Sequence, residues 1–250
     1  MWQRRGGRMR AWTRPGRGGR LGDTLRLSAA SIAAAVLAGT AGYLGIEDQI
    51  RRLGPLPLER AGETSTVVLD RNGDLLRAFT TKDGRWRLPV SHDVVDERYL
   101  DLLIAFEDKR FRDHGGIDWR AFARAGWQLL VNGRIVSGAS TLTMQVARLL
   151  DERHGRAFLI KWRQMLRAVQ LERHLGKDEI LDLYLRLAPF GGNLEGVRAA
   201  SLAYFGREPR RLSLGEAALL VALPQSPEGR RPDIPGNRAS ARAARARVLA

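Results

Sequence analysis

An uncharged run of 20 residues, from Leu27 to Ile46, is the feature that most limits what this chain can fold into. At 1.5 Å per residue, a helix of this length spans the hydrocarbon core of a bilayer. Arginines precede the run, and Glu47 and Asp48 follow it. By the positive-inside rule, this charge difference predicts an uncleaved transmembrane helix over 27–46, with a cytoplasmic N-terminus and an exported C-terminal body.

A cleaved signal peptide is the alternative for this run, but such peptides have a shorter apolar core and a shorter basic start. Residues 1–26 are rich in Arg and Gly and contain a single acidic residue, Asp23. A segment of this kind has too little apolar surface to build a core, so we expect a disordered basic arm on the cytoplasmic side. A linker is expected over 47–64, because it contains Gly54-Pro55-Leu56-Pro57.

Composition restricts the classes of function. The chain has 250 residues and a formal net charge of +15, nearly all of it from Arg. This charge favours anionic partners such as anionic lipid, a phosphorylated substrate or nucleic acid. A nucleic-acid partner is not expected, because the basic arm contains no folded recognition element. The absence of Cys excludes disulfides, thiolate metal sites and a Cys nucleophile, and the His residues show no metal-binding spacing.

After the linker, the pattern predicts a small β element over 65–92. A strand at 65–70 and a strand at 75–79 flank Asn72-Gly73, the residue pair that β-hairpin turns prefer. A short third strand is predicted at 86–90. From 93 to 235 the apolar spacing is helical, with helices predicted at 119–131, 142–150, 157–175, 178–187, 194–204 and 217–223. The end of the chain, 236–250, is expected to begin a following segment that is cut within a helix.

One acidic pair interrupts this apolar pattern. Read at helical period, Leu100, Leu103, Ile104, Glu107 and Phe111 fall on one stripe, so Glu107 occupies a position where an apolar residue is expected. A carboxylate held among apolar groups suits a general base or acid. The alternative from these residues alone is a structural salt bridge to an arginine. Asp108 is turned about 100° away on an ideal helix.

Five motifs then follow one another in a fixed order. They are Glu107-Asp108-x-x-Phe111-x-x-His114-x-Gly116, Gly138-x-Ser140-Thr141-x-x-x-Gln145, Lys161 with Gln164, Lys177-x-x-Ile180-Leu181-x-x-Tyr184-Leu185, and Gly191 to Gly196 with Ala199 to Gly206. In order and spacing, they resemble the peptidoglycan glycosyltransferase domain of class A penicillin-binding proteins, glycosyltransferase family 51. The resemblance covers about residues 65–235 and rests on the whole set rather than on any one motif.

The resemblance implies a mainly α, lysozyme-like fold and an enzyme that polymerises lipid II at the outer face of the bacterial cytoplasmic membrane. It implies that Glu107 is the general base, which takes the proton from the 4-hydroxyl of the acceptor sugar. That oxygen attacks the anomeric carbon of the donor MurNAc with inversion and expels undecaprenyl pyrophosphate. Asp108 matches the second acid of the motif, which would orient the base or a metal.

Other positions are implied to bind substrate. They are Phe111, His114, Ser140, Thr141, Gln145, Arg148, Arg156, Lys161 and Gln164. Among these, Arg148, Arg156 and Lys161 would surround the donor pyrophosphate, because fixed cations stabilise the charge of that leaving group. Gln164 replaces the Glu that is usual in the family, which leaves the leaving group to cations and to an expected divalent metal, Mg²⁺ or Mn²⁺. The implied partners are lipid II, the growing glycan strand, the membrane and other cell-wall synthesis proteins.

The transpeptidase chemistry of class A proteins is not expected from this chain, because no Lys has a Ser three positions before it. Two alternatives from other classes stay open. One is a glycan hydrolase on the same lysozyme-like fold, and the other is an inactive membrane scaffold that only binds a lipid-II-like molecule. Trp119, Trp127 and Trp162 are expected to be core or membrane-facing rather than sugar-binding.

Overall fold

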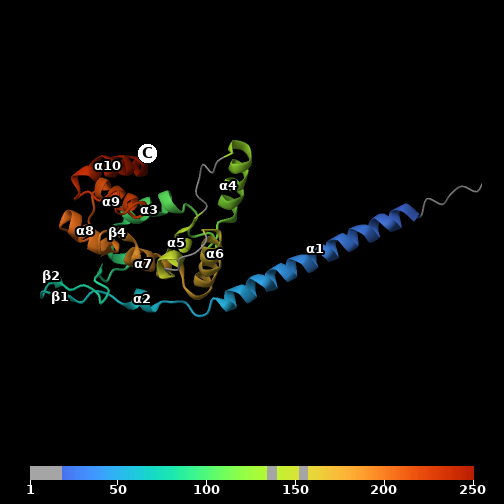
Figure 1. Cartoon of the computed structure of the whole chain (residues 1–250), viewed down its shortest axis with the longest axis horizontal. Helices are drawn as coiled ribbons and strands as arrows, with labels where there is room; N and C mark the ends of the chain where they lie inside the picture. The colour runs from blue at the N-terminus through green and yellow to red at the C-terminus, as the bar shows by residue number, and fades with distance from the viewer. Residues whose placement is uncertain (1–18, 134–139, 152–156) are drawn as a thin grey trace, which may run out of the picture. The chain divides into compact units, whose positions relative to one another are not determined.

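The computed structural model describes residues 19–133, 140–151 and 157–250. They belong to two compact units, residues 1–51 and 52–250, which are considered separately. Helix α1, Gly19–Arg52, accounts for the described part of the first unit (Figure 1). The first 18 residues of the predicted basic arm lie outside the described residues.

Helix α1 confirms that the uncharged run 27–46 is helical. In the part of the chain that the structure describes, however, no helix combines the length with the apolar character that a membrane crossing needs. The transmembrane helix over 27–46 stays a prediction.

The predicted linker is partly helical. Helix α1 continues through Arg52, and a short helix α2, Glu59–Gly62, forms before the β element. Gly54 ends the first helix with a φ of +73°, a conformation that glycine adopts without steric cost. In the second unit, the buried side chain of Arg167 donates to the carbonyls of Leu53, Gly54 and Pro55 at 2.9–3.1 Å. These bonds fix the start of that unit.

The second unit is mainly helical, as predicted. Its longer helices are α3 (Glu97–Glu107), α4 (Trp119–Asn132), α5 (Leu142–Leu150), α6 (Ala157–His174), α7 (Lys177–Leu187), α8 (Val197–Phe205), α9 (Leu214–Ala222) and α10 (Arg238–Leu249). Short 3₁₀ turns are η1 (His92–Val94), η2 (Leu223–Gln225) and η3 (Pro235–Asn237). Local capping explains several boundaries: Asp118 accepts from the Ala121 amide before α4, and Ser213 with Glu216 forms a capping box before α9.

The predicted hairpin is confirmed. Strand β1, Val67–Leu69, pairs antiparallel with β2, Leu75–Ala78. Gly73 has a φ of +86°, and the Asp70 carboxylate accepts from the main-chain amides of Asn72 and Asp74 at 2.7 and 2.9 Å. The turn chemistry therefore sets the pairing of the two strands locally.

The third predicted strand belongs to a different sheet. Strand β3, Trp86–Arg87, is parallel to β5, Leu194–Glu195, which is antiparallel to β4, Pro189–Gly191. Strand β3, from the predicted β element, therefore pairs with a strand that follows α7. Spacing along the chain gives no signal for a pairing of such high sequence separation.

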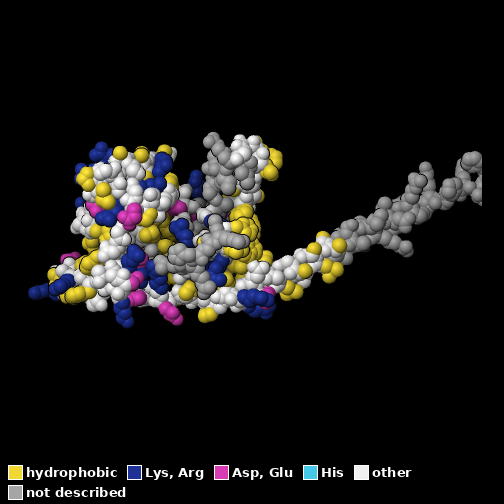
Figure 2. Space-filling model, viewed as in Figure 1, with side chains coloured by type: hydrophobic (Ala, Val, Ile, Leu, Met, Phe, Trp, Pro, Cys, Tyr) yellow, Lys and Arg dark blue, Asp and Glu magenta, His cyan; other side chains and the backbone are white. Residues whose placement is uncertain are grey.

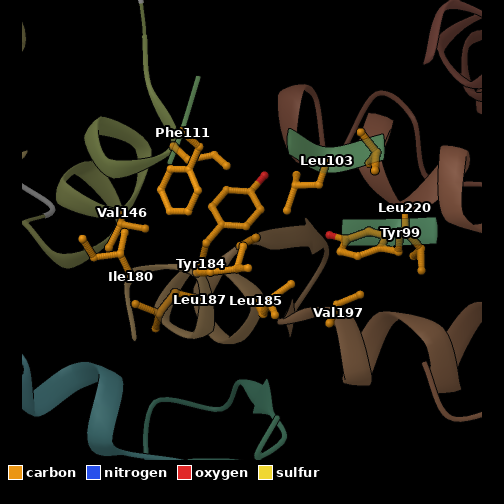
Figure 3. Close-up of a cluster of buried hydrophobic side chains, with 14 of the residues drawn as sticks. Tyr99, Leu103, Phe111, Val146, Ile180, Tyr184, Leu185, Leu187, Val197 and Leu220 are labelled. Carbon is orange, nitrogen blue, oxygen red and sulfur yellow. The ribbon is translucent and has the colours of Figure 1, made fainter. Parts of the chain in front are cut away.

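The core of the second unit lies where the helices meet. Tyr99 and Leu103 of α3 pack with Val146 of α5, Tyr184 of α7 and Leu220 of α9 (Figure 3). Each of these side chains is at most 1% exposed. Full burial of a Leu or Val side chain contributes about 1.5–3 kcal/mol, so this cluster fixes α3 and α5, the two elements that carry the acidic pair and the Ser/Thr/Gln motif.

The last helix belongs to the second unit. Helix α10 packs on α9 there (Figure 1). Its face of Ala241, Ala244 and Val248 is buried. Alanines at helical spacing allow two helices to approach closely, and the Arg-rich composition of the other face hides this pattern in the sequence.

Candidate active site

Glu107 is the last residue of α3. The helix starts at Asp96, whose carboxylate accepts from the Arg98 amide, and buries Tyr99 and Leu103 on its core face. Asp108 follows as the C-cap with a φ of −158°, so the helix ends before Phe111, the last residue of the predicted apolar stripe. Phe111 reaches the core from the turn that follows rather than from the helix. The end of a well-packed helix therefore carries Glu107 to the surface of the core.

Two neutral amides hold the Glu107 carboxylate. Gln145 of α5 donates from Nε2 to Oε2 at 2.8 Å, and Gln225 of η2 donates from Nε2 to Oε1 at 2.7 Å. No arginine or lysine forms a salt bridge with Glu107 in the described residues, so the alternative of a structural salt bridge finds no support. Each oxygen has two lone pairs and accepts one amide, which leaves acceptor capacity for a substrate proton.

Asp108 is buried and has a different set of partners. Its Oδ2 accepts from the Leu142 amide at 2.9 Å, and its oxygens lie 3.0 Å from His114 Nε2. The Gly116 amide donates to His114 Nδ1 at 3.2 Å, so the imidazole proton is on Nε2 and points at Asp108. The Asp108 carboxylate thus ties the loop after α3 to the N-terminus of α5 and holds the two walls of the site together.

Helix α5 starts at Leu142 as predicted, after two adjacent hydroxyl residues. The N-cap is Thr141, not Ser140: its hydroxyl accepts from the Met144 amide at 3.1 Å and donates to the Gly116 carbonyl at 2.7 Å. Ser140 is thereby left to accept a hydrogen bond from Lys161 Nζ. Of the two adjacent hydroxyl side chains, Thr141 caps the helix and Ser140 contacts the cation.

The predicted cations lie on α5 and α6. Arg148 is exposed, and Lys161 is half-buried beside Ser140. Burial, and then the positive charge of Arg148, hold the pKa of Lys161 below its ordinary value. The two cations are therefore close enough to repel each other and would gain from an anion between them. Arg156 lies outside the described residues, as does Gly138 of the second motif.

Phe111 and His114 support the site from behind. Phe111 is fully buried in the core (Figure 3), and the His114 side chain is 9% exposed. Lys177 Nζ lies 4.6 Å from the Phe111 ring centroid and donates to the His114 carbonyl at 2.6 Å. Contact of these two side chains with substrate stays a prediction. Sequence reasoning placed Lys177 in a motif without assigning it this role.

Gln164 occupies separate surroundings. It lines a small cavity of about 20 Å³ with Asp151, Arg163 and Ala147 rather than the cleft at Glu107. Asp151 accepts from Arg163 Nε at 2.6 Å. The place where the family's second Glu is usual therefore faces an ion pair between α5 and α6.

An open cleft of about 580 Å³ brings several predicted residues together. Its walls are formed by Phe106, Glu107, Asp108, Lys109, Arg110, Asp118, Ala121, Arg124, Ser140 and Thr141. Sequence reasoning did not assign a role to the cations Lys109, Arg110 and Arg124. Arg110 binds Asp118 with Nη2 2.6 Å from Oδ2. Although burial opposes it, hydrogen bonding to Arg110 holds the pKa of Asp118 below its ordinary value.

The charge on Glu107 also affects the pKa values of two tyrosines in the core. The phenols of Tyr99 and Tyr184 are fully buried, and their pKa values are raised first by that burial. The negative charge of Glu107 raises both pKa values further. The carboxylate therefore has an apolar core on one side and the cleft on the other, in agreement with its place on the predicted apolar stripe.

A metal site is not evident in the described residues: no three His, Asp or Glu side chains converge there as a ligand set. Asp108, the nearest carboxylate to Glu107 along the chain, is already used by the Leu142 amide and His114. The expected divalent cation stays a prediction.

Comparison with known proteins agrees with the motifs. The family model described as Transglycosylase matches residues 72–250. Penicillin-binding protein 1C of Escherichia coli (strain K12) is 52% identical over 198 residues, which are 79% of this chain and 25% of that protein. Penicillin-binding protein 1F of Bacillus subtilis (strain 168) is 37% identical over 163 residues, which are 65% of this chain and 22% of that protein.

A solved structure also aligns. The crystal structure of penicillin-binding protein 1A from Haemophilus influenzae covers 75% of this chain and 18% of its own, at 20% identity and a TM-score of 0.38, which is too weak a likeness to support an argument. The chain spans about a quarter of the length of the E. coli relative, and no Ser-x-x-Lys is found in it. The family model nevertheless covers most of the chain. This chain therefore belongs to the transglycosylase family and carries the peptidoglycan glycosyltransferase domain of the class A penicillin-binding proteins.

Proposed function

We propose that the chain polymerises lipid II into glycan strands, with Glu107 as the general base. The observation that carries this proposal is the setting of Glu107: a carboxylate at the wall of an open cleft, held by two neutral amides and free of any salt bridge in the described residues. A carboxylate in such a setting can still accept a proton in the transition state.

The proposed reaction uses the acceptor capacity of Glu107. The 4-hydroxyl of the acceptor sugar gives its proton to a Glu107 oxygen while the hydroxyl oxygen attacks the anomeric carbon of the donor MurNAc. The bond from that carbon to the pyrophosphate oxygen breaks, the anomeric configuration inverts, and undecaprenyl pyrophosphate leaves. Asp108 acts indirectly in this proposal, because its hydrogen bonds hold the α3 end against α5.

The leaving group would meet the cations of the site. Lys161 contacts Ser140 at the cleft wall, and Arg148 is close enough to lower the Lys161 pKa. A diphosphate placed between them would relieve their repulsion and gain charge-assisted hydrogen bonds. The cations that line the cleft, Lys109 and Arg124, extend the positive field. This charge supports a glycosyltransferase over a glycan hydrolase, whose substrate carries no diphosphate.

The substrate is lipid-linked, so we also propose that the domain works against a membrane surface. Large apolar side chains of α4 and of the first turn of α6 are exposed, including Trp127 at 68%, Leu130 at 82% and Phe158 at 79%. Figure 2 shows apolar side chains on the surface of this part of the second unit. A soluble surface rarely exposes so many large apolar groups close together along the chain, whereas a lipid surface would cover them.

Incubation of the whole chain with lipid II, followed by separation of the products by length, tests the proposal. Long glycan strands are expected from the wild type, and none from Glu107→Gln, which keeps the size of the side chain and can keep one of its two hydrogen bonds but cannot act as a base. Addition of EDTA, Mg²⁺ or Mn²⁺ to parallel reactions tests the predicted divalent cation.

Two outcomes would replace the proposal. Shortening of pre-made glycan strands without use of lipid II would favour the hydrolase. Binding of lipid II without any product from the wild type would favour an inactive scaffold.

A further inference from the structure

Gln225 contacts Glu107 from 118 residues further along the chain, in a segment to which no motif drew attention. Its amide nitrogen lies 2.7 Å from Glu107 Oε1, the oxygen that Gln145 does not contact. One amide on each oxygen determines both the position of the carboxylate and its rotation about the last side-chain bond. Without Gln225, Glu107 would be held at one oxygen only.

The backbone that carries Gln225 is firmly anchored. Turn η2 follows α9 directly, and its residues Leu223 and Pro224 are fully buried in the core. The Ser226 amide closes the turn on the Leu223 carbonyl at 3.1 Å. The side chain of Gln225 is exposed, yet it starts from a fixed point beside the cleft.

Arg230 fixes which end of the Gln225 amide faces Glu107. Its Nη1 donates to the Ala222 carbonyl at 2.6 Å and to Gln225 Oε1 at 3.1 Å. Because a guanidinium only donates, it selects the amide oxygen and leaves the amide nitrogen to point at Glu107. Hydrogen bonds therefore link Arg230 to Gln225 and Gln225 to Glu107, and the neutral amide of Gln225 lies between the cation and the base.

We propose that Gln225 is a positioning residue for Glu107 and that Arg230 orients it. The amide holds the carboxylate in its reactive rotation and separates it from the Arg230 charge, which would make it a poorer proton acceptor in direct contact. This inference rests on the proposed function, since it assigns Gln225 a part in the same reaction.

The test compares Gln225→Ala and Gln225→Glu with the wild type in lipid II polymerisation, by initial rates over a range of substrate concentrations and pH. For Gln225→Ala, kcat should fall about fivefold, as for loss of an exposed hydrogen bond to a charged group, while KM for lipid II stays within about twofold. For Gln225→Glu, a carboxylate faces Glu107, so the acid limb of the rate profile should move up by about one pH unit.

Ser226→Ala is the matched control, because no hydrogen bond joins its side chain to Glu107 in the described part of the chain, and it should retain wild-type kcat. Thermal melting of each variant checks folding. An active wild type with unchanged kcat and pH profile in both Gln225 variants overturns the inference alone. A raised KM with unchanged kcat also overturns it, since Gln225 would then bind substrate. A wild type that makes no glycan overturns the proposed function and this inference with it.

Discussion

Two glutamates of the same domain are held in opposite ways. Glu195 of β5 is buried, and its Oε2 accepts hydrogen bonds from Arg87 Nε and Nη2 at 2.8 and 2.6 Å. The Arg87 side chain is itself fully buried, and its Nη1 donates to the carbonyls of Arg60 and Glu63. Glu107, by contrast, faces an open cleft, and among the described residues its carboxylate accepts hydrogen bonds from the amides of Gln145 and Gln225.

The difference teaches how a fold separates structural from reactive carboxylates. A buried carboxylate needs a fixed cation, because a charge in a low-dielectric interior is costly unless it is paired and fully hydrogen-bonded. The same cation would favour the charged form and weaken the group as a base. Neutral amides orient a carboxylate without this loss, provided that water or substrate solvates the remaining lone pairs.

The largest effect on stability is expected from breaking the buried pair. Arg87→Met should reduce the free energy of unfolding by about 3 kcal/mol, because Glu195 loses its two shortest hydrogen bonds and its buried cation and keeps the longer ion pairs to Arg60 at 3.3 Å and Arg85 at 3.7 Å. Chemical denaturation measures this loss. Arg85→Met is the matched control. The Arg85 side chain is 40% exposed, and its Nε lies 3.7 Å from Glu195 Oε1, which is a longer contact than that of Arg87. This substitution should change the free energy of unfolding by less than about 1 kcal/mol. Equal effects of the two variants would remove the distinction drawn for Glu195.

A smaller loss of stability is expected from a substitution in the loop that follows Glu107. Gly116 has a φ of +91°, and an added Cβ would lie 2.7 Å from the Ala168 carbonyl oxygen of α6. Gly116→Ala should therefore cost about 2–3 kcal/mol of stability through strain and displacement. Gly115→Ala next to it meets no atom within 4 Å and should be nearly neutral in the same denaturation experiment. A neutral Gly116→Ala would show that the loop beside Glu107 is not fixed by this contact.

Asp108→Asn should cost less, about 1–2 kcal/mol. The amide oxygen can keep one of the two donors, the Leu142 amide or His114 Nε2, but its NH₂ group faces the other. In the proposed reaction Asp108 positions Glu107 and Glu107 accepts the substrate proton, so polymerisation should fall less for Asp108→Asn than for Glu107→Gln. Activity as low as that of Glu107→Gln at unchanged stability would assign Asp108 a direct role.

The smallest effect concerns a partly exposed pair. Hydrogen bonding to Asp182 raises the pKa of His92 above its usual 6.5. The charged pair therefore stabilises the fold fully below about pH 6.5, and this contribution is lost as the pH rises through the raised pKa. His92→Gln should lower the melting temperature at acidic pH and converge with the wild type at alkaline pH. A constant difference across pH would show that the contact is not ionic.

Local chemistry predicted much of this fold. Asn72-Gly73 predicted the hairpin, and helical spacing predicted the start of α4 at Trp119 and of α5 at Leu142, because each of these signals depends on residues close together in the chain. The five motifs also placed Glu107, Ser140 and Thr141 at one cleft.

Contacts of high sequence separation were beyond such reasoning. The pairing of β3 with β5, the bond from Gln225 to Glu107 and the packing of α10 on α9 leave no periodic trace in the chain. Adjacent hydroxyls were also indistinguishable: either Ser140 or Thr141 could cap α5, and the Gly116 carbonyl and Lys161 decide between them.

The central claim is that Glu107 is reactive and Glu195 is structural. The most direct test measures lipid II polymerisation per folded molecule, together with melting temperature, for Glu107→Gln and Glu195→Gln. The account predicts that Glu107→Gln melts like the wild type and loses about 10²–10⁴-fold in rate, whereas Glu195→Gln melts lower and keeps the activity of its folded fraction. Wild-type activity in folded Glu107→Gln would contradict the account.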